Sequence, residues 1–184
     1  MRPAIFLDRD GVIIENRTAY IRSWDDVHIF PQALNALARL QSSPYKIVIV
    51  TNQSVVGRGL ISLQAAWEIN RQLIAVIERA GGRIDQVYLC PHIPEDECTC
   101  RKPKPGLILQ AARELSLDLS HSILIGDTLS DLQAGRLAGV KQVALVRTGL
   151  GATLAQSTPG AEPRDYPAYD TLADALAELV KIET

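Results

Sequence analysis

This chain of 184 residues has no long apolar run, few aromatic residues and no surplus of basic side chains. No apolar stretch approaches the roughly 18 residues of a membrane-spanning helix, which excludes such a helix. The 19 basic and 21 acidic side chains give a net charge of −2. This balance offers no basic footprint for nucleic acid or for an anionic membrane, so we expect neither as a partner.

Cysteine is equally scarce. The chain has 3 cysteines, and all of them lie between residues 90 and 100. An odd number of closely spaced cysteines argues against a disulfide framework and favours a metal site or free thiols. No signal peptide precedes the first apolar strand, which begins at about Pro3. These features predict a cytosolic protein.

Short apolar strands alternate with amphipathic helices along the whole chain. This alternation predicts an α/β fold: a Rossmann-like three-layer sandwich whose central, mainly parallel sheet has five strands. We expect a single domain over residues 1–184 with no large cap domain, because the only sizeable insertions are 11–30 and 91–104. Residues 148–170 are rich in Gly, Pro and Thr and are expected to wrap the surface. The expected strands are 4–8, 46–52, 84–90, 122–127 and 142–146, and the expected helices are 31–41, 62–80, 106–116, 130–138 and 172–182.

Polar residues follow the first four predicted strands. Two acids one residue apart at the end of a buried strand repel each other, and a bound cation or a role in phosphate transfer offsets that cost. The carboxyl ends of parallel strands share one edge, where ligands bind, so acids, a hydroxyl and a lysine should converge there. This set suits phosphoryl transfer. Arg9 should point away from the site, because side chains alternate along an extended segment. The converging residues are Asp8, Asp10, Thr51, Lys102, Asp127 and Asp131.

Four motifs follow one another along the chain: Asp8-Arg9-Asp10-Gly11, Thr51-Asn52-Gln53-Ser54, Arg101-Lys102-Pro103, and Gly126-Asp127 with Asp131. In this order they resemble the motifs of the haloacid dehalogenase (HAD) superfamily of phosphatases. The resemblance implies a HAD-like fold in which Asp8 forms an aspartyl-phosphate and Asp10 is the general acid and base. Thr51 would donate to the phosphoryl group and Lys102 would offset its charge. It also implies Mg²⁺ held by Asp8, the Asp10 main-chain carbonyl and Asp127. Asp131 is either a supporting carboxylate or a helix acid.

The cysteine-rich loop at about residues 90–104 is a candidate zinc site. Cys90, His92, Cys98 and Cys100 match a closed tetrahedral Cys₃His set, although their spacing is tighter than in common zinc fingers. Reduced thiols without a structural role are the alternative. The loop also resembles the zinc-bearing subgroup of HAD phosphatases, where the metal is structural. A zinc ion here would fix the direction of Arg101 and Lys102.

That subgroup acts on heptose bisphosphates or on histidinol phosphate. Arg58 between Gly57 and Gly59 favours the heptose enzymes, and thus hydrolysis of the C7 phosphate of D-glycero-D-manno-heptose 1,7-bisphosphate. The short spacing between His92 and Cys98 favours histidinol phosphate as the alternative. Val55 stands where the family usually has a glycine, and Thr128 stands where it often has a lysine. Substrate contacts are expected from Asn16, Arg17, Tyr20, Asn52, Gln53, Ser54, Arg58 and Arg101.

Two other functions share parts of this pattern. Receiver-type phosphoacceptor modules also combine acids, a threonine and a lysine on a parallel sheet, but their acids follow a different strand order. Polynucleotide 3′-phosphatases share the four motifs, but they need a basic groove that this composition does not supply. We therefore expect a small phosphorylated sugar as the substrate. The resemblance to short phosphatases also implies a monomer.

Overall fold

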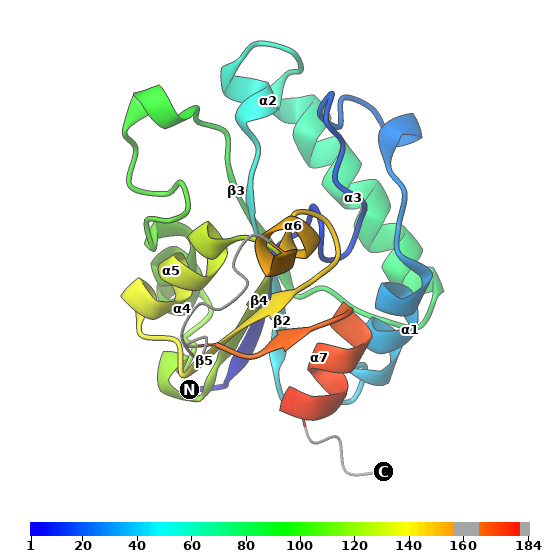
Figure 1. The fold of residues 1–184 in the computed structure, drawn as a ribbon, viewed down its shortest axis with the longest axis vertical. Helices are drawn as coiled ribbons and strands as arrows, with labels where there is room; N and C mark the ends of the chain where they lie inside the picture. The colour runs from blue at the N-terminus through cyan, green and yellow to red at the C-terminus, as the bar shows by residue number, and fades with distance from the viewer. Residues whose placement is uncertain (157–165, 181–184) are drawn as a thin grey trace.

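The computed structural model describes residues 1–156 and 166–180, and their centre is a parallel sheet (Figure 1). The sheet has six strands in the order β3-β2-β1-β4-β5-β6, one more than the sequence predicts. The additional strand pairs with β5 and has only two residues, too few to show periodicity. The strands are β1 (Ala4–Leu7), β2 (Lys46–Asn52), β3 (Gln86–Cys90), β4 (Ile123–Gly126), β5 (Gln142–Val146) and β6 (Ala168–Tyr169).

Helices cover both faces of this sheet, so the predicted three-layer arrangement is confirmed (Figure 1). One face packs against α1 (Pro31–Arg39), α3 (Leu63–Arg79) and α7 (Leu172–Leu179). The other packs against α4 (Gly106–Glu114) and α5 (Leu129–Ala138). Two short helices, α2 (Ser54–Gly57) and α6 (Gly151–Gln156), lie in stretches that the sequence predicts as loops. In the described part of the chain, no helix is long and apolar enough to cross a membrane.

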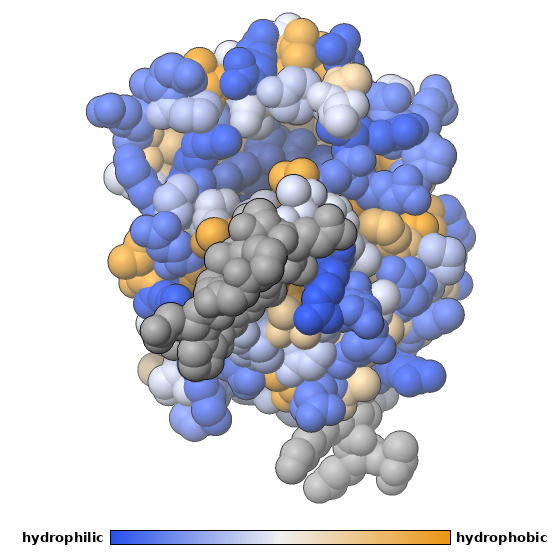
Figure 2. Space-filling view, viewed as in Figure 1, coloured by the Kyte–Doolittle hydropathy of each residue, from blue (hydrophilic) through white to orange (hydrophobic). Residues whose placement is uncertain are grey.

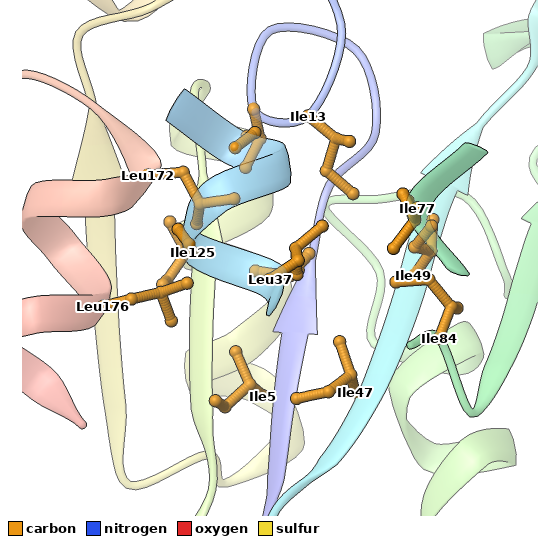
Figure 3. Close-up of a cluster of buried hydrophobic side chains, with 14 of the residues drawn as sticks. Ile5, Ile13, Leu37, Ile47, Ile49, Ile77, Ile84, Ile125, Leu172 and Leu176 are labelled. Atoms are coloured by element: carbon orange, nitrogen blue, oxygen red, sulfur yellow. The ribbon is translucent and has the colours of Figure 1, made fainter. Parts of the chain in front are cut away.

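The pleat of the strands divides the core into two clusters. Along β1, Ile5 and Leu7 face the α1, α3 and α7 layer, whereas Ala4 and Phe6 face the α4 and α5 layer. All four side chains are fully buried, as expected for the continuous apolar run of a parallel strand. Figure 3 shows the first cluster, in which Leu37, Ile77, Leu172 and Leu176 converge on Ile5, Ile47, Ile49 and Ile125.

Side-chain caps set the beginnings of two long helices. Ser62 accepts a hydrogen bond from the Ala65 amide and starts α3 where the sequence predicts it. Thr128 and Asp131 form a capping box at the start of α5. The threonine that replaces the usual family lysine is thus the N-cap of the helix that carries Asp131.

The strand order places a topological switch point at β1. Strands β2 and β3 lie on one side of β1 within the sheet, and β4, β5 and β6 lie on its other side. Crevices at the carboxyl ends of the strands flanking such a point are the usual ligand sites of open α/β sheets. Asp8 and Asp127 follow β1 and β4 directly, so the topology brings both carboxylates to this point.

Candidate functional site

Three carboxylates meet where β1 and β4 end. Asp8, Asp127 and Asp131 each offer an oxygen within 4.8 Å of the others, and all three residues are buried. We call these residues the acid cluster. The Asp8 amide donates to the Ile125 carbonyl at 3.0 Å, which fixes the end of β1 against β4. Buried carboxylate oxygens at this spacing fit a hard divalent cation such as Mg²⁺.

Lys102 is the cation that balances this cluster. Its Nζ lies 2.8 Å from Asp8 Oδ1 and 2.6 Å from Asp131 Oδ1, and it donates to the Val50 carbonyl at 2.7 Å. Burial acts to lower the pKa of Lys102, but the negative charges of Asp131 and Asp8 outweigh this effect and raise the pKa above its usual value. The ammonium therefore stays charged. Asp131 therefore has both of the roles that the sequence left open: it supports the site and caps α5.

The acid cluster disfavours its own negative charge. Burial raises the pKa of Asp8 well above its usual range, and although Lys102 lowers it, Asp131, Asp127 and Asp10 add to the rise. Burial and then Asp131 raise the pKa of Asp127 to about 6, against the lowering effect of the Leu150 amide. A divalent cation would offset this repulsion, which is the electrostatic reason to expect one here.

The segment that follows β5 lies over the acid cluster. The sequence predicts that residues 148–170 wrap the surface, and of these residues 157–165 lie outside the described part of the chain. The Leu150 amide donates to Asp127 Oδ2 at 2.9 Å, and the Thr148 hydroxyl donates to the Gly11 carbonyl. Asn16 Nδ2 donates to the same Asp127 oxygen at 2.7 Å. The carboxyl end of β5 shares the edge of the other parallel strands, so strand order could have revealed this segment.

Gly11 makes this close approach possible. Its φ of +83° lies in the left-handed region, and a Cβ there would collide with the Asp127 carboxylate and the Asn16 amide. The glycine that closes the first motif therefore leaves room for two other members of the site.

The run after β2 holds other site residues in place. Gln53 Nε2 donates to Thr51 Oγ1 and to Asp10 Oδ2, each at 2.8 Å. Because Thr51 Oγ1 accepts this bond, its hydroxyl proton is left for another acceptor. Asn52 exchanges two hydrogen bonds with the main chain of Lys102. The Asn52 and Gln53 side chains, predicted to contact substrate, thus bind other predicted site residues.

The alternation of side chains predicts that Arg9 points away from the site, but its guanidinium does not stay apart from it. Its guanidinium turns back to bind the Asp10 carboxylate and also donates to Asn70 Oδ1 at 2.8 Å. Arg9 and Asn70 are each 1% exposed. The strand pattern indicated the direction of the arginine but not the length of its reach, and nothing in the sequence pointed to Asn70 on α3.

Four further ligands converge at the end of β3, and we call Cys90, His92, Cys98 and Cys100 the cysteine cluster. One ligand atom of each lies within 4.8 Å of the others. The thiols are 3.1–3.7 Å apart, and His92 Nδ1 is 3.5 Å from Cys90 Sγ and 3.3 Å from Cys100 Sγ. A zinc ion about 2.3 Å from each sulfur places tetrahedral ligands about 3.7 Å apart, so this set fits zinc.

Burial raises the pKa of Cys90 and Cys100, but Cys98 differs. Burial acts to raise its pKa as well, yet the Arg101 amide and the other two thiols lower it to about 7. One thiolate is therefore available near neutral pH to begin metal binding. Arg101 Nη1 then donates to His92 O at 3.1 Å and to Ser54 Oγ at 2.9 Å, which joins the cysteine cluster to the run after β2.

A cavity of about 280 Å³ unites most of the predicted site residues. Figure 2 shows a recess lined mainly by hydrophilic residues in the upper half of this face. Thr51 lies beneath the lining and is fully buried, and Arg58 lies instead 6.0 Å from the ring centre of Tyr20. The predicted residues in the lining are Asp8, Asp10, Asn16, Arg17, Tyr20, Asn52, Gln53, Ser54, Arg101, Lys102, Asp127 and Asp131.

Comparison with known proteins agrees with this geometry. The family model described as HAD-hyrolase-like matches residues 99–178. The D-glycero-beta-D-manno-heptose-1,7-bisphosphate 7-phosphatase of Bordetella bronchiseptica is 38% identical over 178 residues, which are 96% of this chain and 97% of that protein. The enzyme of the same name from Neisseria meningitidis serogroup B is 36% identical over 170 residues, covering 92% of this chain and 90% of that protein.

A solved structure shares the whole fold. The crystal structure of D,D-heptose 1,7-bisphosphate phosphatase from B. bronchiseptica, complexed with magnesium and phosphate, has a TM-score of 0.88 and 37% identity. The match covers 97% of this chain and 98% of that one. This chain belongs to the HAD superfamily of hydrolases, in the family of phosphatases that contains these relatives.

Proposed function

We propose that this chain is a Mg²⁺-dependent phosphatase that removes the C7 phosphate from D-glycero-D-manno-heptose 1,7-bisphosphate. The observation that carries the proposal is the buried Asp8 carboxylate, held 2.8 Å from Lys102 at a polar cavity beside Asp127. This arrangement combines a nucleophile, a fixed cation and a cation site, which together suit attack on phosphorus.

In the first half-reaction, an Asp8 oxygen attacks phosphorus and the bond to the sugar oxygen breaks. Asp10 gives its proton to that departing oxygen, and in the second half-reaction it takes a proton from the water that hydrolyses the aspartyl-phosphate. Lys102 offsets charge on the phosphoryl oxygens. The Thr51 hydroxyl donates its one proton to one of these oxygens, since its oxygen already accepts a hydrogen bond from Gln53 Nε2.

Asp8, Asp127 and the Asp10 main-chain carbonyl would hold Mg²⁺, which when bound neutralises charge on the carboxylates and the phosphoryl group. We propose that the cysteine cluster holds a structural zinc ion. Its contribution is the shape of the loop that delivers Arg101 and Lys102 to the cavity. The whole chain would then be one domain with a zinc-binding loop at about residues 90–104.

The charges around the cavity support a substrate with two phosphates. Arg17 and Arg101 line it in addition to the buried Lys102. Lys102 is bound to Asp8 and Asp131, so the two arginines are the cations placed to bind a second phosphate. The relatives in B. bronchiseptica and N. meningitidis are named for the β anomer, which supports that anomer as the substrate here.

The decisive test is phosphate release in the presence of Mg²⁺, comparing kcat/KM for the two anomers of heptose 1,7-bisphosphate with kcat/KM for histidinol phosphate. We expect the β anomer to exceed histidinol phosphate by about 100-fold or more, which is about 2.7 kcal/mol of transition-state binding. A preference for histidinol phosphate would overturn the substrate assignment. Salt-dependent preference for a 3′-phosphorylated oligonucleotide would instead support the polynucleotide phosphatase.

Location and oligomeric state also remain predictions. As the sequence predicts, we propose that the protein is a cytosolic monomer without nucleic acid or membrane partners. Size-exclusion chromatography with light scattering tests the monomer, and a stable dimer would contradict it. Fractionation of cells that express the full chain tests the location.

A further inference from the structure

Arg9 is the largest fully buried side chain of the described residues, and it carries a charge. Within the described part of the chain, its side-chain hydrogen bonds run to two residues. Nε donates to Asp10 Oδ2 at 3.1 Å, Nη2 donates to Asp10 Oδ1 at 3.2 Å, and Nη1 donates to Asn70 Oδ1 at 2.8 Å. A buried guanidinium is costly unless it is paired, and packing alone at this position would favour an apolar residue. The arginine therefore points to a role in holding Asp10.

Asn70 is a second buried polar side chain whose burial costs stability. It is the one polar member of the buried stripe of α3, beside Ala66, Ile69, Leu73 and Ile77. Its Nδ2 is buried and has no hydrogen-bond partner among the described residues. An unpaired buried donor destabilises a protein, so an apolar residue would pack here at less cost. What the asparagine supplies is Oδ1, the acceptor that fixes the far end of the Arg9 guanidinium.

The contacts of Asp10 distinguish its two oxygens. Oδ2 accepts from Arg9 Nε and from Gln53 Nε2, and Arg9 Nη2 also lies 3.1 Å from it. Among residues 1–156 and 166–180, Oδ1 accepts from Arg9 Nη2 alone. A carboxylate oxygen has two lone pairs, so Oδ2 is fully used and Oδ1 keeps one lone pair for a proton.

We propose that Arg9 and Asn70 are positioning residues that fix the Asp10 carboxylate, so that its Oδ1 carries the transferred proton. This inference rests on the proposed phosphatase function. As Asp8 bonds to phosphorus and the sugar oxygen leaves, the Oδ1 proton moves to that oxygen. As water then bonds to phosphorus and the bond to Asp8 breaks, a water proton returns to Oδ1. Asn70 touches no reacting atom and acts through Arg9.

The leaving group separates this role from a purely structural one. A sugar alkoxide needs a proton in order to leave, whereas p-nitrophenolate does not. A misplaced Asp10 should therefore slow aspartyl-phosphate formation from an alkyl phosphate, but hardly from p-nitrophenyl phosphate. Hydrolysis of the intermediate needs Asp10 as a base with either substrate, so the intermediate should accumulate from the aryl phosphate.

The test compares the wild type with Asn70→Leu, Asn70→Ala and Arg9→Lys on heptose 1,7-bisphosphate and on p-nitrophenyl phosphate. For each variant we expect kcat on the bisphosphate to fall about 30-fold, with KM within about twofold. On the aryl phosphate, rapid mixing should show a burst of about one equivalent of p-nitrophenolate, followed by slow turnover. Leu73→Ala, a fully buried position on the same stripe, is the control and should show no burst.

Equal losses on both substrates without a burst would overturn the inference, and so would a burst in Leu73→Ala or wild-type kinetics in the variants. Thermal midpoints show which variants fold. If the Asn70 variants do not fold, Arg9→Lys, which keeps the charge but loses the planar fork, decides the matter. If the wild type hydrolyses neither ester, the proposed function itself fails, and that result differs from every outcome above.

Discussion

The acid cluster and the cysteine cluster both gather metal-ligating side chains, but they draw them from very different distances along the chain. Asp8 and Asp131 are separated by most of the sequence and meet because parallel strands end at one edge. Cys90 ends β3, and His92, Cys98 and Cys100 lie in the loop that follows directly. The sheet therefore holds the acid cluster whether or not metal is present, whereas the loop of the cysteine cluster depends on its ligands for shape.

The two clusters also differ in what a metal ion does for the fold. The acid cluster is repulsive without a cation, since burial raises the pKa of Asp8 and Asp127. Removing one of its acids should leave the fold intact and stop the chemistry. Removing a ligand of the cysteine cluster should lower the stability of the fold, and the loss of structure should then lower the catalytic activity. The experiments below test this contrast.

The largest expected effect is on Asp8→Asn. We expect kcat to fall by about 10⁴-fold or more, because an amide does not attack phosphorus. The thermal midpoint of the metal-free protein should stay the same or rise, since the change removes a buried charge near Asp127 and Asp131. Phosphate release and differential scanning calorimetry measure the two effects. Retained turnover, or a midpoint that drops by many degrees, would contradict the contrast.

Cys98→Ala should show the opposite pattern. We expect the thermal midpoint to fall by roughly 10 °C, because a structural zinc site contributes several kcal/mol, and activity should fall with it. A chelator, with Mg²⁺ then added back, should lower the wild-type midpoint by a similar amount and leave the variant unchanged. Glu95→Ala, an exposed position in the same loop, is the control. A wild-type midpoint that a chelator does not move would exclude the zinc ion.

Arg101 joins the cysteine cluster to the run after β2 and lines the same cavity as the acid cluster, so its variants test how far catalysis depends on this connection. Arg101→Met breaks the hydrogen bonds to His92 and Ser54 but keeps an unbranched side chain. We expect kcat/KM to fall by about 30-fold, since charge-assisted hydrogen bonds contribute about 2 kcal/mol, while the zinc content is unchanged. Kinetics and metal analysis of the purified variant measure the two quantities. Loss of zinc would show that the arginine stabilises the loop instead.

The smallest expected effect is the pH dependence of stabilisation by Mg²⁺. Burial holds the pKa of Asp127 at about 6, whereas an unfolded Asp has a pKa of about 3.9. Between these values the folded chain keeps a proton that the unfolded chain loses, so metal-free stability falls as the pH rises from about 4 to 6. Mg²⁺ binds the deprotonated carboxylate, and its stabilisation should therefore grow as the pH rises.

Thermal unfolding with and without Mg²⁺ at pH 5 and pH 7.5 measures this growth. We expect the gain in midpoint to be about 3–6 °C larger at the higher pH. In Asp127→Asn, which removes this titrating group, the gain should depend less on pH, and the raised pKa of Asp8 accounts for the dependence that is left. An equal gain at both pH values in the wild type would show that Asp127 is already ionised in the metal-free fold.

The local sequence pattern was a sound guide wherever one segment decides its own structure. Ser62 begins α3 as predicted, and the apolar runs before Asp8 and Asp127 form buried strands. It missed features that depend on partners far along the chain. The two-residue strand β6 forms because β5 offers an open edge, and Leu150 reaches Asp127 because β5 ends beside β4.

By itself, the sequence determined the α/β class, the four motifs and the composition of both clusters. Strand periodicity and helix caps depend on residues close together in the sequence, and ligand chemistry depends on residue type alone. Only the tertiary structure decided the Arg9 and Asn70 support of Asp10, the position of Leu150 and the commitment of Gln53 to its neighbours. These contacts depend on strand order and on how far a side chain reaches, and neither quantity has a local signal.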